Sequence, residues 1–226
     1  MIKIGNTEIK KAYLGSTELS QIYIGNVPLL STKTVIEQLQ DLGCLMWFPM
    51  NSNGFNDVVG SRAYSATSSF TTKGTYCQCI FTNNNIATID ITSLTSSDFV
   101  DGGFTTFLQA QRHGTASFRG SALCHLVNNV GIAGAYDNVN NTADTSQWTT
   151  NTWYEGVIVR NQDGTRKIYS QQTLIVDDTY TYPDIWDYNT IAVKAANNKR
   201  LYVRNFLLFG KALSAAEISQ VHQLIS

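Results

Sequence analysis

Hydrophobic and polar residues alternate along most of the chain, and small polar residues and glycines interrupt the alternation at short intervals. A period of two is typical of strands that bury one face, and the interruptions are typical of turns. The clearest predicted strands cover residues 153–160, 190–195 and 201–209. The predicted turns are at Asn53-Gly54, Asp101-Gly102-Gly103, Asp163-Gly164 and Asn197-Asn198. Many short strands separated by turns predict an all-β protein, folded as a two-sheet jelly-roll sandwich.

Residues 34–42 change to a helical period, with apolar residues on one face. Thr34 and Glu37 have the spacing of a capping box, in which each side chain bonds the backbone at the other's position. Gly43 follows as a natural C-terminal stop. We therefore expect a short helix that links the residues before it to the sandwich.

A second helix is predicted over 215–225, at the end of the sequence. Ser214 and Glu217 form another capping box, and Leu213 with Ile218 has the spacing of a hydrophobic staple. These signals predict a short helix that closes the sandwich.

The first thirty residues contain a ten-residue repeat, with glycine at positions 5, 15 and 25. Each unit predicts a short strand followed by a Gly-Asn or Gly-Ser turn. Three units of this size cannot bury a core alone. They form either a plain β-meander on the main domain or a module for assembly and anchoring. We assign to assembly two of these glycines and the two residues before each of them. These residues are Tyr13, Leu14, Gly15, Tyr23, Ile24 and Gly25.

This pattern divides the chain into three parts. Residues 1–30 are the repeat segment for attachment or oligomerisation, 31–43 a short helical linker, and 44–226 the sandwich.

Composition limits the possible functions. Charged residues are only 15% of the chain and the net charge is −1, while Thr, Asn and Ser exceed a quarter of all residues. The absence of a basic run argues against nucleic-acid binding. No stretch is apolar enough for a transmembrane helix, and the first residues lack the apolar region of a signal peptide. As written, we expect a chain made and kept in a cytoplasm unless lysis or other machinery releases it.

Four cysteines, at 44, 77, 79 and 124, favour buried free thiols. The alternative is a zinc site formed by Cys77, Cys79, Cys124 and His125, although its spacing departs from the usual Cys-x-x-Cys unit.

Three motifs resemble the laminin-G-like, concanavalin A-like jelly rolls. One is the closing run of residues 201–218, where a strand and a turn lead into Leu-Ser-Ala-Ala-Glu-Ile. Another is the Trp-initiated strand 152–160, with the following segments 163–164, 167–169 and 172–174. The third is 45–51 with Asn56-Asp57, and 104–107 is similar to a further strand of these domains. The resemblance covers residues 44–226 and implies the same fold.

The repeat, in which Tyr-Leu-Gly-Ser-Thr-Glu-Leu is the clearest unit, resembles segments that open structural proteins of tailed bacteriophages. That resemblance implies a virion component: a fibre, an appendage or a capsid or tail decoration. It implies other virion proteins as partners of residues 1–30, and a homo-oligomer, with a trimer suggested because many phage fibres are trimeric. It places the protein in the virion, assembled in the host cytoplasm and released by lysis.

Glycoside hydrolases with this fold need two carboxylates on either side of the glycosidic bond. Of five glutamates, two lie in the repeats and two in capping boxes, which leaves Glu155 without an acidic partner two or four residues away. The three histidines, at 113, 125 and 222, form no pattern with a nucleophile. We therefore expect no enzymatic activity.

Binding of a host-surface glycan is the favoured alternative, because sugar recognition combines aromatic rings with amides and carboxylates. Residues 177–189 are read as a loop rich in both, and 136–148 as a second polar loop. The candidate glycan-binding residues are Tyr180, Tyr182, Asp184, Trp186, Asp187 and Tyr188. The bland alternative is that Tyr182 or Trp186 only closes the sandwich edge. Trp47 and Trp153 are expected in the core.

No cofactor is expected. Calcium is a lesser possibility, because oxygen ligands suit this ion and four aspartates gather here: Asp177, Asp178, Asp184 and Asp187. The sequence thus favours a non-enzymatic phage structural protein with an exposed jelly roll. Two other functions remain open: a free bacterial lectin domain, and a scaffold that makes only protein contacts.

Overall fold

The computed structural model of the chain describes the following backbone segments: 2–4, 7–9, 12–14, 17–19, 21–24, 27–31, 33–51, 56–60, 70–81, 87–90, 93–113, 126–127, 132–133, 151–179, 190–193 and 199–226. Side chains are described in a smaller set: 33–51, 56–60, 71–78, 93–100, 102–111, 151–179 and 202–226.

Two antiparallel sheets form the body of the molecule. The larger has the order β16 (Thr173–Thr179), β15 (Thr165–Ser170), β14 (Trp153–Arg160), β11 (Phe104–His113), β18 (Lys199–Phe209), β9 (Cys77–Phe81) and β8 (Phe70–Thr72), and β7 (Cys44–Phe48) also pairs with β18. The smaller has the order β10 (Ala87–Asp90), β17 (Thr190–Val193), β12 (Leu126–Val127) and β13 (Ile132–Ala133). This architecture confirms the predicted jelly-roll sandwich.

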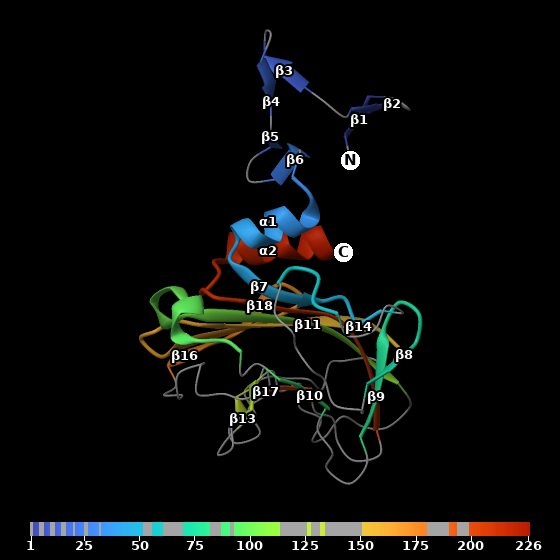
Figure 1. Ribbon diagram of the computed structural model, residues 1–226, viewed down its shortest axis with the longest axis vertical. Helices are drawn as coiled ribbons and strands as arrows, with labels where there is room; N and C mark the ends of the chain where they lie inside the picture. The colour runs from blue at the N-terminus through green and yellow to red at the C-terminus, as the bar shows by residue number, and fades with distance from the viewer. Residues whose placement is uncertain are drawn as a thin grey trace.

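The large sheet lies between two layers (Figure 1). Helices α1 (Val35–Asp41) and α2 (Ala215–Ile225) lie on one side of it, and β10, β13 and β17 on the other. Two single-turn 3₁₀ helices, η1 (Ser96–Asp98) and η2 (Val100–Gly102), lie at one end of the large sheet, beside β16. The strands that the sequence predicted at 153–160, 190–195 and 201–209 correspond to β14, β17 and β18 within a few residues.

A compact hydrophobic cluster joins the two helices to the large sheet. Leu39 and Val221 from the helices and Phe107, Leu207 and Phe209 from the sheet have no exposed surface. The rings of Phe107 and Phe209 meet edge to face, with centroids 5.7 Å apart. The helices therefore cover a sheet face that would otherwise expose apolar side chains to water.

Alternate residues of the same strands fill the opposite face. Met46, Phe48, Leu108, Phe206 and Leu208 are all fully buried there. β11 and β18 therefore contribute buried apolar side chains to both faces of the large sheet.

Both predicted helices are confirmed, and each begins with its capping box. The Glu37 amide donates to Thr34 Oγ1, and the Thr34 amide donates to Glu37 Oε2. α1 ends at Asp41 with Leu42 as its C-cap, and Gly43 follows with φ of +80°, as expected of a C-terminal stop.

α2 spans the predicted residues. Ser214 and Glu217 make the equivalent pair of hydrogen bonds at its start. Leu213 and Ile218 are both buried, as a hydrophobic staple requires.

Each decapeptide unit forms a hairpin rather than the single strand we predicted. The strands are β1 (Ile2–Ile4), β2 (Thr7–Ile9), β3 (Ala12–Leu14), β4 (Thr17–Leu19), β5 (Gln21–Ile24) and β6 (Val27–Ser31). They pair as β1–β2, β3–β4 and β5–β6, with the pairing closing at Ile4–Thr7, Leu14–Thr17 and Ile24–Val27. Only two residues separate the two strands of each hairpin.

Two other expectations are wrong. Trp153 is only half-buried and lies on the helix-facing side of the large sheet, not in the core. Asp177 and Asp178 lie in β16 and not in a loop, because the strand continues to Thr179 and both carboxylates pair with β15. Trp47 is partly buried and packs against the helix-side cluster.

Candidate functional site: a polar groove at one end of the sandwich

The predicted glycan-binding residues and most of the other predicted site residues lie outside the described residues. These include Tyr180, Tyr182, Asp184, Trp186, Asp187 and Tyr188, the polar loop 136–148, and the cysteine and histidine at 124 and 125. Of the assembly residues, Tyr13 and Leu14 lie in β3, and Tyr23 and Ile24 in β5. Gly15 and Gly25 lie outside the described residues.

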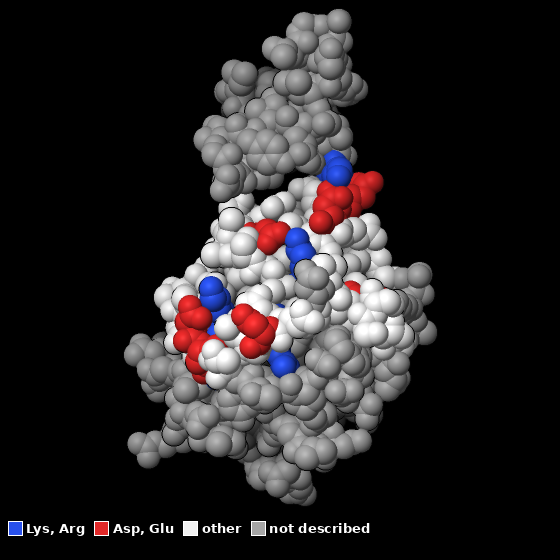
Figure 2. All heavy atoms as spheres, turned by 90° about the vertical axis from the view of Figure 1, so that its left-hand side faces the viewer, with Lys and Arg blue, Asp and Glu red and all other residues white. Residues whose placement is uncertain are grey.

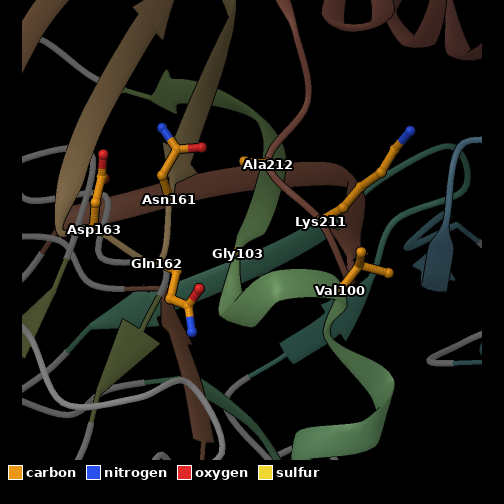
Figure 3. Close-up of a pocket in the computed structure, with 7 residues that line it drawn as sticks. All are labelled: Val100, Gly103, Asn161, Gln162, Asp163, Lys211 and Ala212. Carbon is orange, nitrogen blue, oxygen red and sulfur yellow. The ribbon is translucent and has the colours of Figure 1, made fainter.

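The described part of the sandwich has an open groove of about 480 Å³ at the end where η2 lies (Figure 3). Three connections line it: η2 with Gly103, the β14–β15 turn, and the segment from β18 to α2. The lining residues are Val100, Gly103, Asn161, Gln162, Asp163, Lys211 and Ala212. In Figure 3 the three turn residues stand on one side, Lys211 and Val100 on the other, and Gly103 and Ala212 lie between them. We refer to this hollow as the end groove.

Hydrogen bonds hold the turn side of the end groove in one shape. The backbone N–H of Asn161 donates to the Thr165 carbonyl at 3.0 Å, and Gly164 has φ of +85°. Asp163 Oδ1 accepts from both the amide and the hydroxyl of Thr165, at 2.9 and 2.7 Å. These bonds lower the pKa of Asp163, so this carboxyl is ionised at neutral pH.

The opposite side is fixed by the start of α2. Lys211 Nζ donates to Glu217 Oε1 at 2.7 Å, and Thr105 Oγ1 donates to the Lys211 carbonyl at 2.9 Å. Burial opposes the ionisation of Glu217, but hydrogen bonds from Lys211 and Ser214 outweigh burial and lower the pKa of Glu217. Lys211 is thereby held at the edge of the end groove as a cation.

The base of the end groove leaves little room for a side chain at Gly103. A Cβ at Gly103 would lie 3.1 Å from both the Ala212 nitrogen and the Arg160 carbonyl oxygen, which is too close for ordinary packing. Val100, whose side chain is 63% exposed, adds an apolar surface at the rim.

The end groove presents hydrogen-bonding groups that the protein does not use itself. Asn161 Oδ1, Asp163 Oδ2 and the Gln162 amide have no partner in the part of the chain that the structure describes. Together with the ammonium group of Lys211 they can accept from and donate to a ligand rich in hydroxyl groups. The face shown in Figure 2 mixes acidic and basic side chains among the described residues, so the ligand is not selected there by a field of one sign.

Glu155, the carboxylate left over in the sequence, is not placed to attack a substrate. Its side chain is 2% exposed and lies under α2, where Oε2 contacts His222 Nδ1 at 2.8 Å. Gln109 Nε2 donates to the same oxygen at 3.2 Å, and Gln171 Oε1 accepts from the Glu155 amide at 2.9 Å. Among the described residues, no carboxylate contacts Glu155, so they offer no catalytic pair of acids around it.

The two cysteines whose side chains are described are buried free thiols, as predicted. Burial raises the pKa of Cys77 to about 11. Burial, together with the nearby Asp57 carboxylate, raises the pKa of Cys44 still further. Neither thiol is a reactive nucleophile at neutral pH, because the thiolate is the reactive form.

The described residues hold no cluster of three or more side chains arranged for a metal ion. Asp177 lies 3.9 Å from Lys167, and Asp178 Oδ2 accepts from Arg166. These ion pairs occupy two of the four aspartates named for calcium, and the other two lie outside the described residues.

Within the part of the chain that the structure describes, no helix is both long and apolar enough to cross a membrane.

The sequence indicated part of the end groove and missed the rest. Asp163-Gly164 was identified as a turn, and the amide-rich run Asn161-Gln162 beside it is a signal that could have marked a binding loop. Lys211 and Val100 could not be found in this way, because only the folded sheet brings them to the same end.

No family model matches the sequence, and no curated protein matches it. Comparison with solved structures shows the fold. Botulinum neurotoxin type C aligns with a TM-score of 0.61 at 13% identity, over 83% of this chain and 53% of the toxin chain. The binding domain of botulinum neurotoxin DC, solved with SialylT, gives 0.60 at 13% identity, over 85% and 53%.

A Trypanosoma rangeli sialidase aligns with a TM-score of 0.59 at 15% identity, over 81% of this chain and 33% of the sialidase. This chain thus spans about half the length of the toxin chains and a third of the sialidase chain. At this level of identity the similarity shows the jelly-roll fold.

Proposed function

We propose that this protein is a non-enzymatic carbohydrate-binding jelly roll, displayed on a bacteriophage virion and attached there through residues 1–30. The observation that carries the carbohydrate proposal is the end groove, in which Asn161, Gln162 and Asp163 offer unused polar groups opposite Lys211. Sugar hydroxyls are the natural partners of such a set, since each can donate and accept.

The structural neighbours support the same class of ligand. Cell entry of the type C neurotoxin depends on interaction with two ganglioside molecules, and the DC binding domain was solved with SialylT. Two neighbours of the same fold therefore work by binding, one to gangliosides and the other to SialylT. The identity is too low to transfer their binding residues, so the end groove stands on its own geometry.

We propose the absence of enzymatic activity from the buried position of Glu155. A catalytic acid must reach the glycosidic oxygen, and Glu155 is buried and bonded to His222 and Gln109. Release of reducing sugar from a host polysaccharide by the full chain, abolished in Glu155→Gln, would overturn this proposal.

The virion role is proposed from the repeat. Three hairpins of equal design, each closed by a two-residue loop, precede a sandwich that has its own core. Short two-stranded sheets are unstable alone and gain most from packing on neighbours, so a partner protein or further copies of the chain would stabilise them. We expect an oligomer, and we suggest a trimer.

The carbohydrate proposal is tested by binding of the full chain to a glycan array. The informative variant is Asp163→Asn, which keeps an oxygen for Thr165 but removes the charge at the end groove. We expect about tenfold weaker binding, which corresponds to about 1.4 kcal/mol. Asp177→Asn is the matched control, because Asp177 is an exposed aspartate on β16 outside the groove lining. Failure of the native chain to bind any glycan, or equal binding by Asp163→Asn, would refute the proposal.

The attachment proposal is tested by the mass of the full chain in solution. Tyr13→Asp with Tyr23→Asp places charges in two hairpins and is expected to dissociate an oligomer into single chains. A native chain that is a single copy, and that also fails to co-purify with virions, would contradict the virion role.

A further inference from the structure

A row of polar side chains crosses the helix-facing side of the large sheet, next to the hydrophobic cluster under α2. Gln109 on β11 is paired with Glu155 on β14 and with Arg204 on β18. Residues directly opposite each other on antiparallel strands point to the same face. His222 of α2 reaches Glu155, which identifies this face as the one beneath the helix.

A second row lies two residues further along the strands, on the same face. Gln111 is paired there with Trp153 and with Tyr202. Tyr76 packs on both aromatic rings, with its centroid 6.0 Å from Trp153 and 4.7 Å from Tyr202. Tyr76, Trp153, Tyr202 and Arg204, here called the Arg204 cluster, are each half-buried.

Two contacts hold the guanidinium of Arg204 in a fixed plane. Its Cζ lies 4.4 Å from the centroid of the Trp153 ring, and its Nε donates to Gln109 Oε1 at 2.9 Å. Its terminal N–H groups have no partner in the described structure, and neither does the indole N–H of Trp153. The only fully buried side-chain atom without a partner there is Glu155 Oε1, so these donors are open to solvent.

The positive charge of Arg204 also lacks a direct counter-ion among the described residues. Glu155 is the carboxylate of the neighbouring row, but Gln109 stands between the two and His222 binds Glu155 from α2. Burial lowers the pKa of Arg204 from its very high usual value, yet a guanidinium stays protonated in proteins. A half-buried, oriented cation without an acidic partner is an anion-binding group.

We propose that the Arg204 cluster is a second binding site, which takes the carboxylate of an acidic sugar. The proposal rests on the proposed function only in taking the ligand to be a carbohydrate. Two terminal N–H groups of a guanidinium match the two oxygens of a carboxylate, which gives direction as well as charge. The aromatic rings beside it provide the surface on which the apolar face of a pyranose packs.

The site differs in chemistry from the end groove. The end groove combines acceptors with one lysine that is already paired with Glu217, which suits neutral hydroxyl groups. The Arg204 cluster presents the donors of a guanidinium and an indole beside an uncompensated positive charge, which suits an acid. The end groove would therefore bind neutral hydroxyl groups of a glycan, and the Arg204 cluster would bind its acidic group.

The test uses the full chain and two probes that differ only in the acid, methyl β-D-glucuronide and methyl β-D-glucoside. Binding is followed by NMR, through the shifts of the Trp153 indole N–H and the Arg204 Nε–H signals. We expect both signals to move with glucuronide at least tenfold more strongly bound than glucoside. Sodium chloride at equal ionic strength is added as a control, and loss of the preference for glucuronide in this salt would show a non-specific charge effect and overturn the proposal.

Arg204→Gln is expected to remove the preference for glucuronide, and Arg204→Lys to reduce it about tenfold, because lysine keeps the charge but loses the fork. Lys167→Gln is the matched control, since it removes an exposed cation on β15 and should leave the preference unchanged. Equal binding of the two probes by the native chain overturns the proposal even if the Arg204 variants do not fold. Failure of the end groove as a sugar site would instead appear as unchanged glycan binding by Asp163→Asn on the array while the Arg204 result stands.

Discussion

Glu155 and His222 are separated by 67 residues in the sequence, and their side chains meet 2.8 Å apart beneath α2. The carboxylate comes from the middle of the large sheet and the imidazole from the closing helix. Gln109, Asn205 and Trp47 extend the contact into a network, because Asn205 Nδ2 donates to Gln109 and its Oδ1 accepts from Trp47. Four strands and the helix are thus joined by polar contacts beside their hydrophobic cluster.

His222→Ala is expected to destabilise the protein by about 2–4 kcal/mol, because it leaves a buried carboxylate without its partner. The measurement is the free energy of unfolding from urea titration at neutral pH. Combining it with Glu155→Gln, which removes the buried charge, should recover part of the loss. Additive effects of the two substitutions would show that the pair does not interact.

Stability is expected to fall in acid through Glu217. The folded protein lowers the pKa of this carboxyl, so the stabilisation is complete above the unfolded value of about 4.3 and is lost as pH falls through the folded value. Thermal unfolding between pH 6 and pH 3 measures the effect. Glu217→Gln should lower the midpoint at pH 6 and flatten its dependence on pH. An equally steep curve in the variant would assign the acid sensitivity to other groups.

Gly103→Ala is expected to cost about 1–3 kcal/mol and to deform the end groove. The new Cβ would lie 3.1 Å from the Arg160 carbonyl oxygen and the Ala212 nitrogen, so backbone must move. The midpoint of thermal unfolding should fall, and glycan binding should weaken. Gly74→Asn is the control, because nothing lies within 4 Å of a Cβ there and asparagine tolerates its φ of +76°. Unchanged stability in Gly103→Ala would contradict the packing described.

The thiols of Cys44 and Cys77 are expected to resist alkylation in the folded protein. Both are buried, and burial raises both pKa values. A variant with Cys79→Ser and Cys124→Ser isolates these two groups. It should react with a disulfide reagent at pH 8 only after urea is added, when both thiols become accessible. Rapid labelling without urea would contradict the burial of these thiols.

Local signals predicted the elements that local interactions determine. Ser214, Glu217 and the Leu213–Ile218 staple predicted the first residue of α2, because a cap needs only its own turn. The alternation at 153–160 predicted β14 for a similar reason. The Asp101-Gly102-Gly103 signal located the turn beside the end groove, although it did not predict the helical turn η2.

The sequence could not predict which face of β14 meets water. Five of its residues from Gly156 to Arg160 are buried in succession, so alternation does not distinguish an inner face from an outer one. Trp153 was therefore assigned to the core, although it packs beside Arg204. The contact between Glu155 and His222 was missed because it depends on how α2 crosses the sheet. Spacing along the sequence does not predict that crossing.

The hairpins of residues 2–31 have a genetic consequence. Each one closes on itself, since Ile4 pairs with Thr7 and Leu14 with Thr17, and among the described residues no strand of one repeat pairs with a strand of the next. An in-frame duplication or deletion of one decapeptide would therefore add or remove a complete unit without shifting the pairing of any other strand. The length of this segment can change between relatives by recombination within the repeats, while the sandwich and its binding surfaces stay the same.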